Sequence, residues 1–527
     1  MNSFLLFETT ALSDDSPAIT DIRLGTVGYN DASAPGYFAP DISETESITV
    51  ERGIYPSRLA FGFGDEEVAL VSAQNLSGKY DHLADYGFGR EGVLKIGRAG
   101  DAYGEIEAVF TGNVTHVLAG EDVAEFAWRS RSDVLDRPVG AALFEGSNAD
   151  SPSPLTEGTT DDIGGQRKPR AGGVNYNQEP VLVNAPLRIY CWRWNKEGDL
   201  VATHSLDEVR LGGSTWTAGA DYATLDAMLA ASPTVGTYVT CLAKSALLMG
   251  GSNPLGGGVR IDFTVEEAAA DRYASALAAR LIIDAGLSID TASFDALATA
   301  MPYEAGYYNS DDDYRTIIAQ LMGSVLGWAI TSRTGPVVCG TLPDLDAVTT
   351  SINMKQPTAV DPLKSSDLMI KALRPILSND DDLGAAVKEV RVGYYPNDNP
   401  LTLSSIAAAV DDDVKVQLAQ AFRLTNAVID SAAAAKHANA VGITHYTRLT
   451  KKADADAVCL KLASIVKRRK RFVIEAGLSP ELAATLNVGD AITVTHPRYG
   501  FEAGQKVVIV REAIDAGLSN AEFEVLR

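Results

Sequence analysis

The sequence predicts an α+β protein of several domains, in which helical segments are inserted between β-rich domains. The chain has 527 residues, and at about 150 residues per domain this length corresponds to three or four domains. Short β-branched or aromatic runs, separated by glycine turns, fill much of the first 120 residues and predict strands. Apolar residues at helical spacing begin after residue 264 and predict helices.

The first two predicted domains are β-rich. Residues 1–125 form the first, with strands expected near residues 48–50, 68–71, 93–96 and 106–110. Residues 126–262 form the second, with strands near 187–192 and 237–242. Its segment 145–180 is rich in Gly, Pro, Ser, Thr and Asp and too long for an ordinary connection, so we expect a functional loop or an excursion between domains there.

The third predicted domain, residues 263–345, is a helical segment that closes with a β-hairpin. Thr264 and Glu267 have the spacing of a capping box, which predicts that a helix begins at Thr264. Asp311, Asp312 and Asp313 precede an apolar pattern at helical spacing, so a second helix is expected after them. Two β-runs around a glycine turn, residues 328–331 and 337–339, predict the hairpin.

The fourth predicted domain, residues 346–527, mixes helices and strands. A strand is expected at residues 390–395, helices at 414–422 and 453–465, and three antiparallel strands close the chain. Those last strands are expected at residues 472–475, 491–495 and 507–510.

Composition narrows the class of protein. Lys and Arg number 45 against 69 Asp and Glu, a formal net charge of -24, and such a chain repels a phosphate backbone. No basic segment precedes the first apolar run, and residues 317–330 are too few to cross a bilayer, so neither a secretory signal nor a membrane segment is expected. The cysteines are far apart in the sequence and predict buried free thiols; they are Cys191, Cys241, Cys339 and Cys459.

The motifs that normally carry chemistry are missing or explained by local structure. The six histidines lack zinc-site spacing, and no P-loop or GxSxG sequence is present. Residues 87–92 match GxGxxG but lead into a predicted strand, which favours a turn over a dinucleotide site. The Asp triplets at 311–313, 380–382 and 411–413 could hold a hard cation or supply paired carboxylates, but helix starts and a solvated loop are favoured. We therefore predict no enzyme: no catalytic residue, no cofactor and no metal ligand.

One basic segment stands out in this acidic chain: Lys467, Arg468, Arg469, Lys470 and Arg471. A solvated face is the simplest interpretation, and a nucleic-acid or import signal is another. Among functional interpretations we favour a candidate interface between subunits, in which the segment contacts acidic surface of a neighbouring copy.

Four groups of residues, in order along the chain, resemble one protein family. They are residues 75–83 with 86–90; residues 164–173 with 175 and 177–181; residues 300–308 with 327–328; and residues 486–490 with 496–501. Together they resemble the baseplate or tail-tip hub proteins of long-tailed, siphovirus-like bacteriophages and prophages.

The resemblance implies a structural virion protein with barrel-like, tube-type domains. Hub proteins of this kind are homotrimers in which each protomer supplies two such domains to a pseudo-sixfold ring. The ring joins the sixfold tail tube, through a distal tail or tube protein, to threefold central-fibre or other tip proteins. It closes a DNA channel that opens at genome ejection, and DNA passes without specific binding, which suits the net charge of -24.

The implied location is the tail tip of the virion, with the bacterial host cytoplasm as the place of assembly. Two alternatives stay open. A receptor-binding tail fibre or tip protein would favour regular strand repeats, which the sequence lacks. A cell-wall-degrading tail enzyme would need a zinc, Cys–His or lysozyme-like motif, and none is found.

Overall fold

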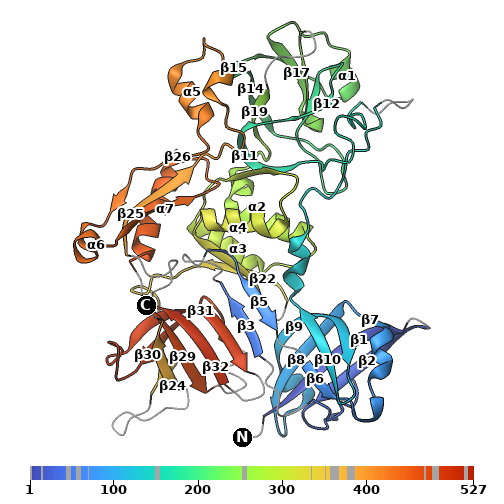
Figure 1. The fold of residues 1–527 in the computed structure, drawn as a ribbon, viewed down its shortest axis with the longest axis vertical. Coiled ribbons are helices and arrows are strands. Elements are labelled where there is room, and N and C mark those ends of the chain that lie inside the picture. Colours follow the sequence, from blue (N-terminus) through green and yellow to red (C-terminus); the bar gives the residue numbers. More distant parts are fainter. Residues whose placement is uncertain are drawn as a thin grey trace.

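The chain divides into layers that follow one another along its long axis (Figure 1). Two β-domains lie side by side at one end, helices form the middle, and further sheets form the other end. This computed structural model describes residues 3–13, 16–42, 49–54, 61–68, 71–148, 155–251, 258–333, 335–350, 352–356, 367–376, 386–467, 470–477, 486–515 and 520–527.

The first β-domain, barrel A, is a curved sheet of six strands in open order, and a short segment bridges its two ends. The strands in order are β2 (Ser16–Gly25), β1 (Ser3–Ser13), β8 (Arg90–Arg98), β9 (Glu107–Ala119), β10 (Val123–Arg129) and β6 (Val71–Gln74). Residues 39–42 form the bridge: Ala39 bridges to Leu24 beside β2, and Ile42 bridges to Ala73 of β6. Alternate residues such as Leu94 and Ile96 point inward and build its core. The short strand β7 (Tyr86–Gly87) pairs with β1.

The second β-domain, barrel B, is a closed ring of six strands. The strands in order are β30 (Ala491–Thr495), β23 (Asn353–Lys355), β24 (Asp367–Pro375), β29 (Arg471–Gly477), β32 (Asn520–Leu526) and β31 (Gln505–Asp515). Pairing of β30 with the first half of β31 closes this ring. The three closing strands that the sequence predicts are therefore confirmed, as parts of a barrel.

Two strands from the N-terminal part of the chain belong to barrel B. Strand β3 (Thr49–Gly53) pairs with the second half of β31, and β5 (Asp65–Val68) pairs with β3. Between them β4 (Gly62–Phe63) pairs with a strand of the helical layer. The chain therefore leaves barrel A, adds an exchanged strand pair to barrel B, and returns. Residues 1–125 are consequently not one continuous domain, because long-range backbone pairing decides where this segment lies.

The helical layer stands directly above the barrels. Its elements are α2 (Ala274–Asp284), α3 (Thr291–Ala300), α4 (Tyr314–Ser324) and the hairpin β21 (Gly327–Thr331) and β22 (Val337–Thr341), which confirms the predicted hairpin. Asp313 caps α4 as predicted, since its side chain accepts a hydrogen bond from the Thr316 backbone N–H.

The predicted helix start at Thr264 is wrong. Thr264 ends strand β19, its hydroxyl donates to Asp207, and the first long helix begins ten residues later at Ala274. Cross-strand pairing thus overrides the local capping pattern.

Two five-stranded sheets form the far end of the molecule. One has the order β15 (Ser214–Thr215), β14 (Ser205–Leu211), β19 (Val259–Thr264), β11 (Arg170–Gln178) and β20 (Gly306–Asn309). The other has the order β12 (Val181–Asn184), β13 (Ile189–Cys191), β18 (Ala246–Met249), β17 (Thr237–Cys241) and β16 (Thr217–Asp221), with the short helix α1 (Leu225–Leu229) beside it.

Strand β11 corrects the predicted 145–180 loop. Its residues 170–178 lie inside the predicted loop, yet they form a largely buried strand between β19 and β20. Its glycines fit because β20 approaches very closely: a Cβ on Gly173 would lie 1.9 Å from the Ala305 carbonyl oxygen.

The predicted domain 346–527 contains a second sheet besides barrel B. It consists of β26 (Arg423–Leu424), β25 (Val387–Tyr394), β27 (Val428–Ile429) and β28 (Val441–Tyr446), accompanied by α5 (Asp412–Ala419), α6 (Ser431–Lys436) and α7 (Lys452–Ile465). One hydrophobic core runs through this sheet, the helical layer and barrel B, whereas barrel A has a core of its own. Residues 263–345 and 346–527 are therefore packed as one body.

Candidate functional site

The most elaborate buried polar contact locks the exchanged strand pair into barrel B. Arg52 of β3 and Arg333, which follows β21, both donate to the carboxylate of Glu512 on β31, at N···O distances of 2.8 to 3.2 Å. Arg52 is 1% exposed, Arg333 4% and Glu512 0%. Arg52 also donates to the Thr331 carbonyl, and Arg333 to that of Leu486. One carboxylate thus holds three separate segments of the chain together.

The triad of Arg52, Glu512 and Arg333 is sensitive to substitution of any member, because all three ions are buried. Two guanidinium groups share one carboxylate in a site closed to water, so each ion depends on the others to offset the cost of burial. Burial lowers the pKa of Arg333, and Glu512 acts in the opposite sense. The triad therefore has the properties of a structural clamp, and no free nucleophile or proton donor is present in it.

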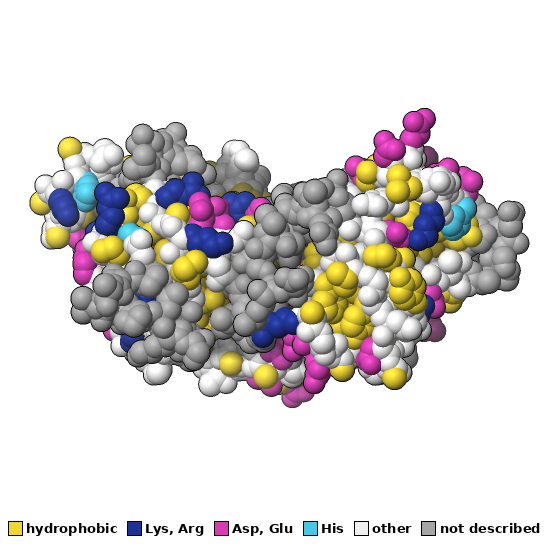
Figure 2. All heavy atoms as spheres, turned by 90° about the horizontal axis from the view of Figure 1, so that it is seen from below, with side chains coloured by type: hydrophobic (Ala, Val, Ile, Leu, Met, Phe, Trp, Pro, Cys, Tyr) yellow, Lys and Arg dark blue, Asp and Glu magenta, His cyan; other side chains and the backbone are white. Residues whose placement is uncertain are grey.

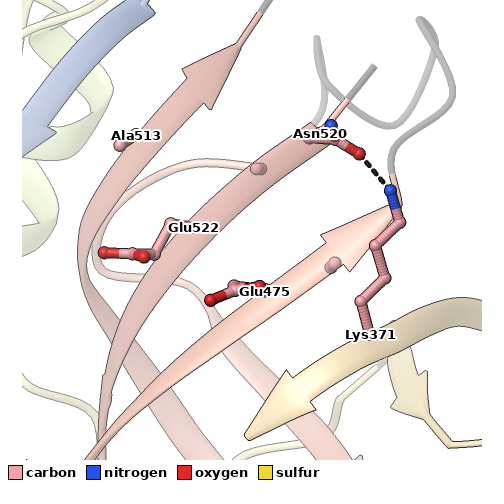
Figure 3. A pocket seen from close by; sticks show the side chains of 7 residues that line it. Lys371, Glu475, Ala513, Asn520 and Glu522 are labelled. Carbon is pink, nitrogen blue, oxygen red and sulfur yellow. Dashed lines mark hydrogen bonds between the residues drawn. The ribbon is translucent and has the colours of Figure 1, made fainter. Parts of the chain in front are cut away.

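The outer face of barrel B carries a groove of about 380 Å³ (Figure 3). Alanine side chains form much of its lining, and charged side chains from three strands surround it: Lys371 of β24, Glu475 of β29 and Glu522 of β32. Glu475 and Glu522 lie opposite each other across the strands, and Arg374 donates to both, at 2.8 and 3.1 Å. Lys371 donates to the Asn520 side chain.

This groove is suited to contact rather than to catalysis. A carboxyl group that acts as a general acid or base needs surroundings that shift its pKa away from that of its neighbour. Here both carboxylates are about half exposed and share one arginine. An open surface with paired charges and small side chains offers a place for another protein to pack.

A second polar cluster joins the far sheets to the small sheet of β25. Asn177, on β11, is fully buried with φ of 51°, and its amide donates to the Asn397 side chain at 2.9 Å and to the Asn399 carbonyl at 3.0 Å. The neighbouring rings of Tyr176 and Tyr395 lie 4.4 Å apart. This cluster fixes the orientation of two sheets and contains the motif residues near 177 that the sequence singled out.

The predicted basic segment is only partly within the described residues. Lys467 is exposed at the end of α7, 4.0 Å from Asp430, and Lys470 is exposed before β29. Arg471 is 8% exposed, and its guanidinium donates to Glu524 of β32 at 2.7 Å, inside the barrel wall. Burial lowers the pKa of Arg471 to about 10, with Glu524 acting in the opposite sense. Arg468 and Arg469 lie outside the described residues.

The other candidate motifs have structural places. Asp313 and Asp411 cap helices α4 and α5, and the triplet 380–382 lies outside the described residues. Among the described residues, no group of three His, Cys, Asp or Glu side chains could hold a metal ion. The GxGxxG match leads into β8, as expected for a turn. All four cysteines are buried free thiols, as predicted.

Sequence reasoning did not find the Arg52–Glu512–Arg333 triad or the groove. Neither has a local pattern, because each brings together residues more than a hundred positions apart. Arg52 lies in a short β-run, but a single sequence does not reveal that its side chain is buried. In the part of the chain that the structure describes, no helix is long and apolar enough to cross a membrane.

Comparison with known proteins gives structural neighbours only. No protein-family model and no curated protein matches the chain. Among solved structures, the 43 kDa tail protein of prophage MuSo2 from Shewanella oneidensis matches over 100% of this chain and 98% of its own, with 10% identity and a TM-score of 0.38. A tail protein from Neisseria meningitidis MC58 matches over 99% of this chain and 96% of its own, with 7% identity and a TM-score of 0.39.

A third neighbour is a chain of the native gene transfer agent virion. It matches over 68% of this chain and 84% of its own, with 12% identity and a TM-score of 0.38. Two of these neighbours are tail proteins and the third is a virion component, the kind of protein that the sequence motifs resemble. Because all three TM-scores lie below 0.5, we take the function from the chain's own geometry.

Proposed function

We propose that this protein is a structural, non-enzymatic component of a phage tail: the homotrimeric hub of a baseplate or tail tip. The observation that carries the proposal is the presence in one chain of a closed six-stranded barrel, barrel B, and a second six-stranded sheet, barrel A, whose two ends residues 39–42 bridge. The exchanged strand pair and its buried triad connect the two. Three chains would supply six barrels, so one ring could match a sixfold tube on one side and threefold partners on the other.

The proposed partners follow from this geometry. The ring of barrels contacts the distal tail or tube protein, and the far sheets at the other end of each chain contact central-fibre or other tip proteins. DNA crosses the lumen during genome ejection without specific binding, which a formal charge of -24 per chain favours because acidic walls repel phosphate. Lys467 and Lys470 stay candidates for contact with an acidic surface of a neighbouring copy.

The test is the mass of the purified protein by light scattering, with negative-stain images of the same fraction. A species of three times 55.9 kDa that forms rings with a central hole is the expected result. An elongated trimer without a hole would contradict the hub and favour the receptor-binding fibre. Clearing of bacterial cell wall in a zymogram would contradict the non-enzymatic role.

A further inference from the structure

The two barrels differ in net charge. Barrel A, counted over residues 1–42 and 71–130, has 15 Asp and Glu against 6 Lys and Arg, a formal charge of -9. Barrel B with its exchanged strand pair and basic segment, residues 49–53, 65–68, 352–376 and 467–527, has 14 Lys and Arg against 14 Asp and Glu, a formal charge of 0. Two copies of barrel A would repel each other, so this difference in charge favours contact between unlike barrels over contact between two barrels A.

The view from below shows the same asymmetry on the surface (Figure 2). Lys and Arg side chains, with some Asp and Glu, lie at the end that holds barrel B and the small sheet of β25, whereas the barrel A end presents many hydrophobic side chains with Asp, Glu and fewer Lys or Arg around them. Within one chain the barrels already meet through the side that carries β10, β5 and β3. Strands β1 and β2 of barrel A and β24 and β30 of barrel B lie on the sides that face away from each other (Figure 1).

The free side of barrel A has an exposed apolar residue beside a carboxylate. Ile19 and Asp21 are two residues apart on β2, so their side chains leave the same face of the strand. Ile19 is 57% exposed and lies opposite Leu12 of β1. The Asp21 side chain is 50% exposed and is paired with Arg23. We call Leu12, Ile19 and Asp21 the β2 patch.

The free side of barrel B has an exposed apolar residue beside a cation. Met369 is 40% exposed on β24, and Lys371 is exposed two residues later. Both side chains extend over Gly477 of β29: a Cβ there would lie 3.5 Å from Lys371 Cε and 4.0 Å from Met369 Cε. Lys371 also forms one wall of the groove in Figure 3. We call Met369, Lys371 and Arg374 the β24 patch.

We propose that the β24 patch of one copy binds the β2 patch of the next copy, with Met369 against Ile19 and Lys371 near Asp21. This inference rests on the proposed ring. A ring of six barrels must cover both sides of each barrel, and the chain itself covers only one. The occupant is a second copy of this chain, because the proposed ring places one there and each patch sets an exposed apolar side chain beside a charged one, Ile19 beside Asp21 and Met369 beside Lys371. Such a head-to-tail contact, repeated three times, closes the ring.

The test is a charge swap between Asp21 and Lys371, measured as the concentration at which half of the protein is trimeric. Asp21→Lys alone and Lys371→Asp alone each place like charges across the contact, so each should raise that concentration about tenfold or more. The double variant carries both changes in one chain and restores an opposite-charge pair at every contact. It should assemble within about threefold of the wild type.

Controls separate the interface from the fold. Lys196→Asp changes an exposed lysine on the far sheets and should leave assembly unchanged. Ile19→Ser removes the apolar half of the proposed contact and should weaken assembly. Combining it with the charge swap should not restore assembly. Circular dichroism melting of each variant verifies folding. If a charge reversal melts early, Asp21→Asn or Lys371→Gln replaces it as a single variant, and each should weaken assembly by removing one charge of the pair.

The outcomes distinguish the two proposals. Single variants that assemble like the wild type, or a double variant that is no better than the singles, would overturn the interface while the wild-type ring stands. A wild-type chain that stays monomeric alone and with its tube protein would overturn the hub, and the interface with it.

Discussion

Replacing Glu512 by glutamine should loosen the exchanged strand pair. The carboxylate accepts three hydrogen bonds from two buried guanidinium groups, and the amide that replaces it has no charge and one acceptor oxygen. Removing one partner of a buried ion pair costs about 3–5 kcal/mol, because the remaining charges stay buried. We therefore expect a loss of about 3 kcal/mol or more in the local stability of β3 and β31.

Native-state hydrogen exchange measures this local stability directly, strand by strand. The amides of β3 and β31 should exchange on the order of 100-fold faster in the variant, since 1.4 kcal/mol corresponds to a factor of about ten. Glu522→Gln is the matched control, because its side chain is 49% exposed and paired with Arg374 at the surface. Such a pair contributes about 0–1 kcal/mol. If Glu512→Gln exchanged no faster than this control, the triad would not be the clamp described above.

Three further predictions concern other parts of the chain. Asp313→Ala removes the cap that accepts the Thr316 N–H and should lower the free energy of unfolding by about 1 kcal/mol, measured by urea titration; no change would refute the cap. Burial lowers the pKa of His445, whose ring bonds the Gly323 carbonyl, so the unfolded chain takes up its proton first. Stability should therefore fall as the pH drops below about 6.5, and His445→Gln should flatten that dependence in melts at pH 7 and 5. Burial raises the pKa of Cys339 to about 12, and all four thiols are buried; a disulfide reagent at pH 8 should titrate none in the native protein and four after denaturation.

Local patterns predicted local structure well. The β21–β22 hairpin and the Asp313 cap depend on neighbouring residues, so turn chemistry and helix electrostatics were enough to place them. The closing strands of the chain were likewise found by their β-branched runs, although their closure into a barrel was not. The capping pattern at Thr264 failed because that residue was already paired in β19.

Long-range pairing accounts for what the sequence did not predict. The sequence assigns strand β3 to the first domain, yet its backbone pairs with residues 511–515 of β31. Local sequence patterns do not identify these pairing partners. The sequence predicts strand β11 as a loop because it lies in a segment rich in Gly, Pro, Ser, Thr and Asp, whereas in the structure its Gly172 and Gly173 allow β20 to approach. The candidate sites depend on the same pairings: the triad and the two patches exist only once distant strands have met.

The exchanged strand pair also has a consequence for biosynthesis. Arg52 and Glu512 are 460 residues apart, so the first strands of barrel B leave the ribosome long before their partners. At about 5–20 residues per second, the delay is roughly half a minute to a minute and a half. During this time β3 and β5 expose unpaired backbone that can join other nascent chains. Barrel A, whose strands are complete by Arg129, can fold early and hold these strands in place until translation ends.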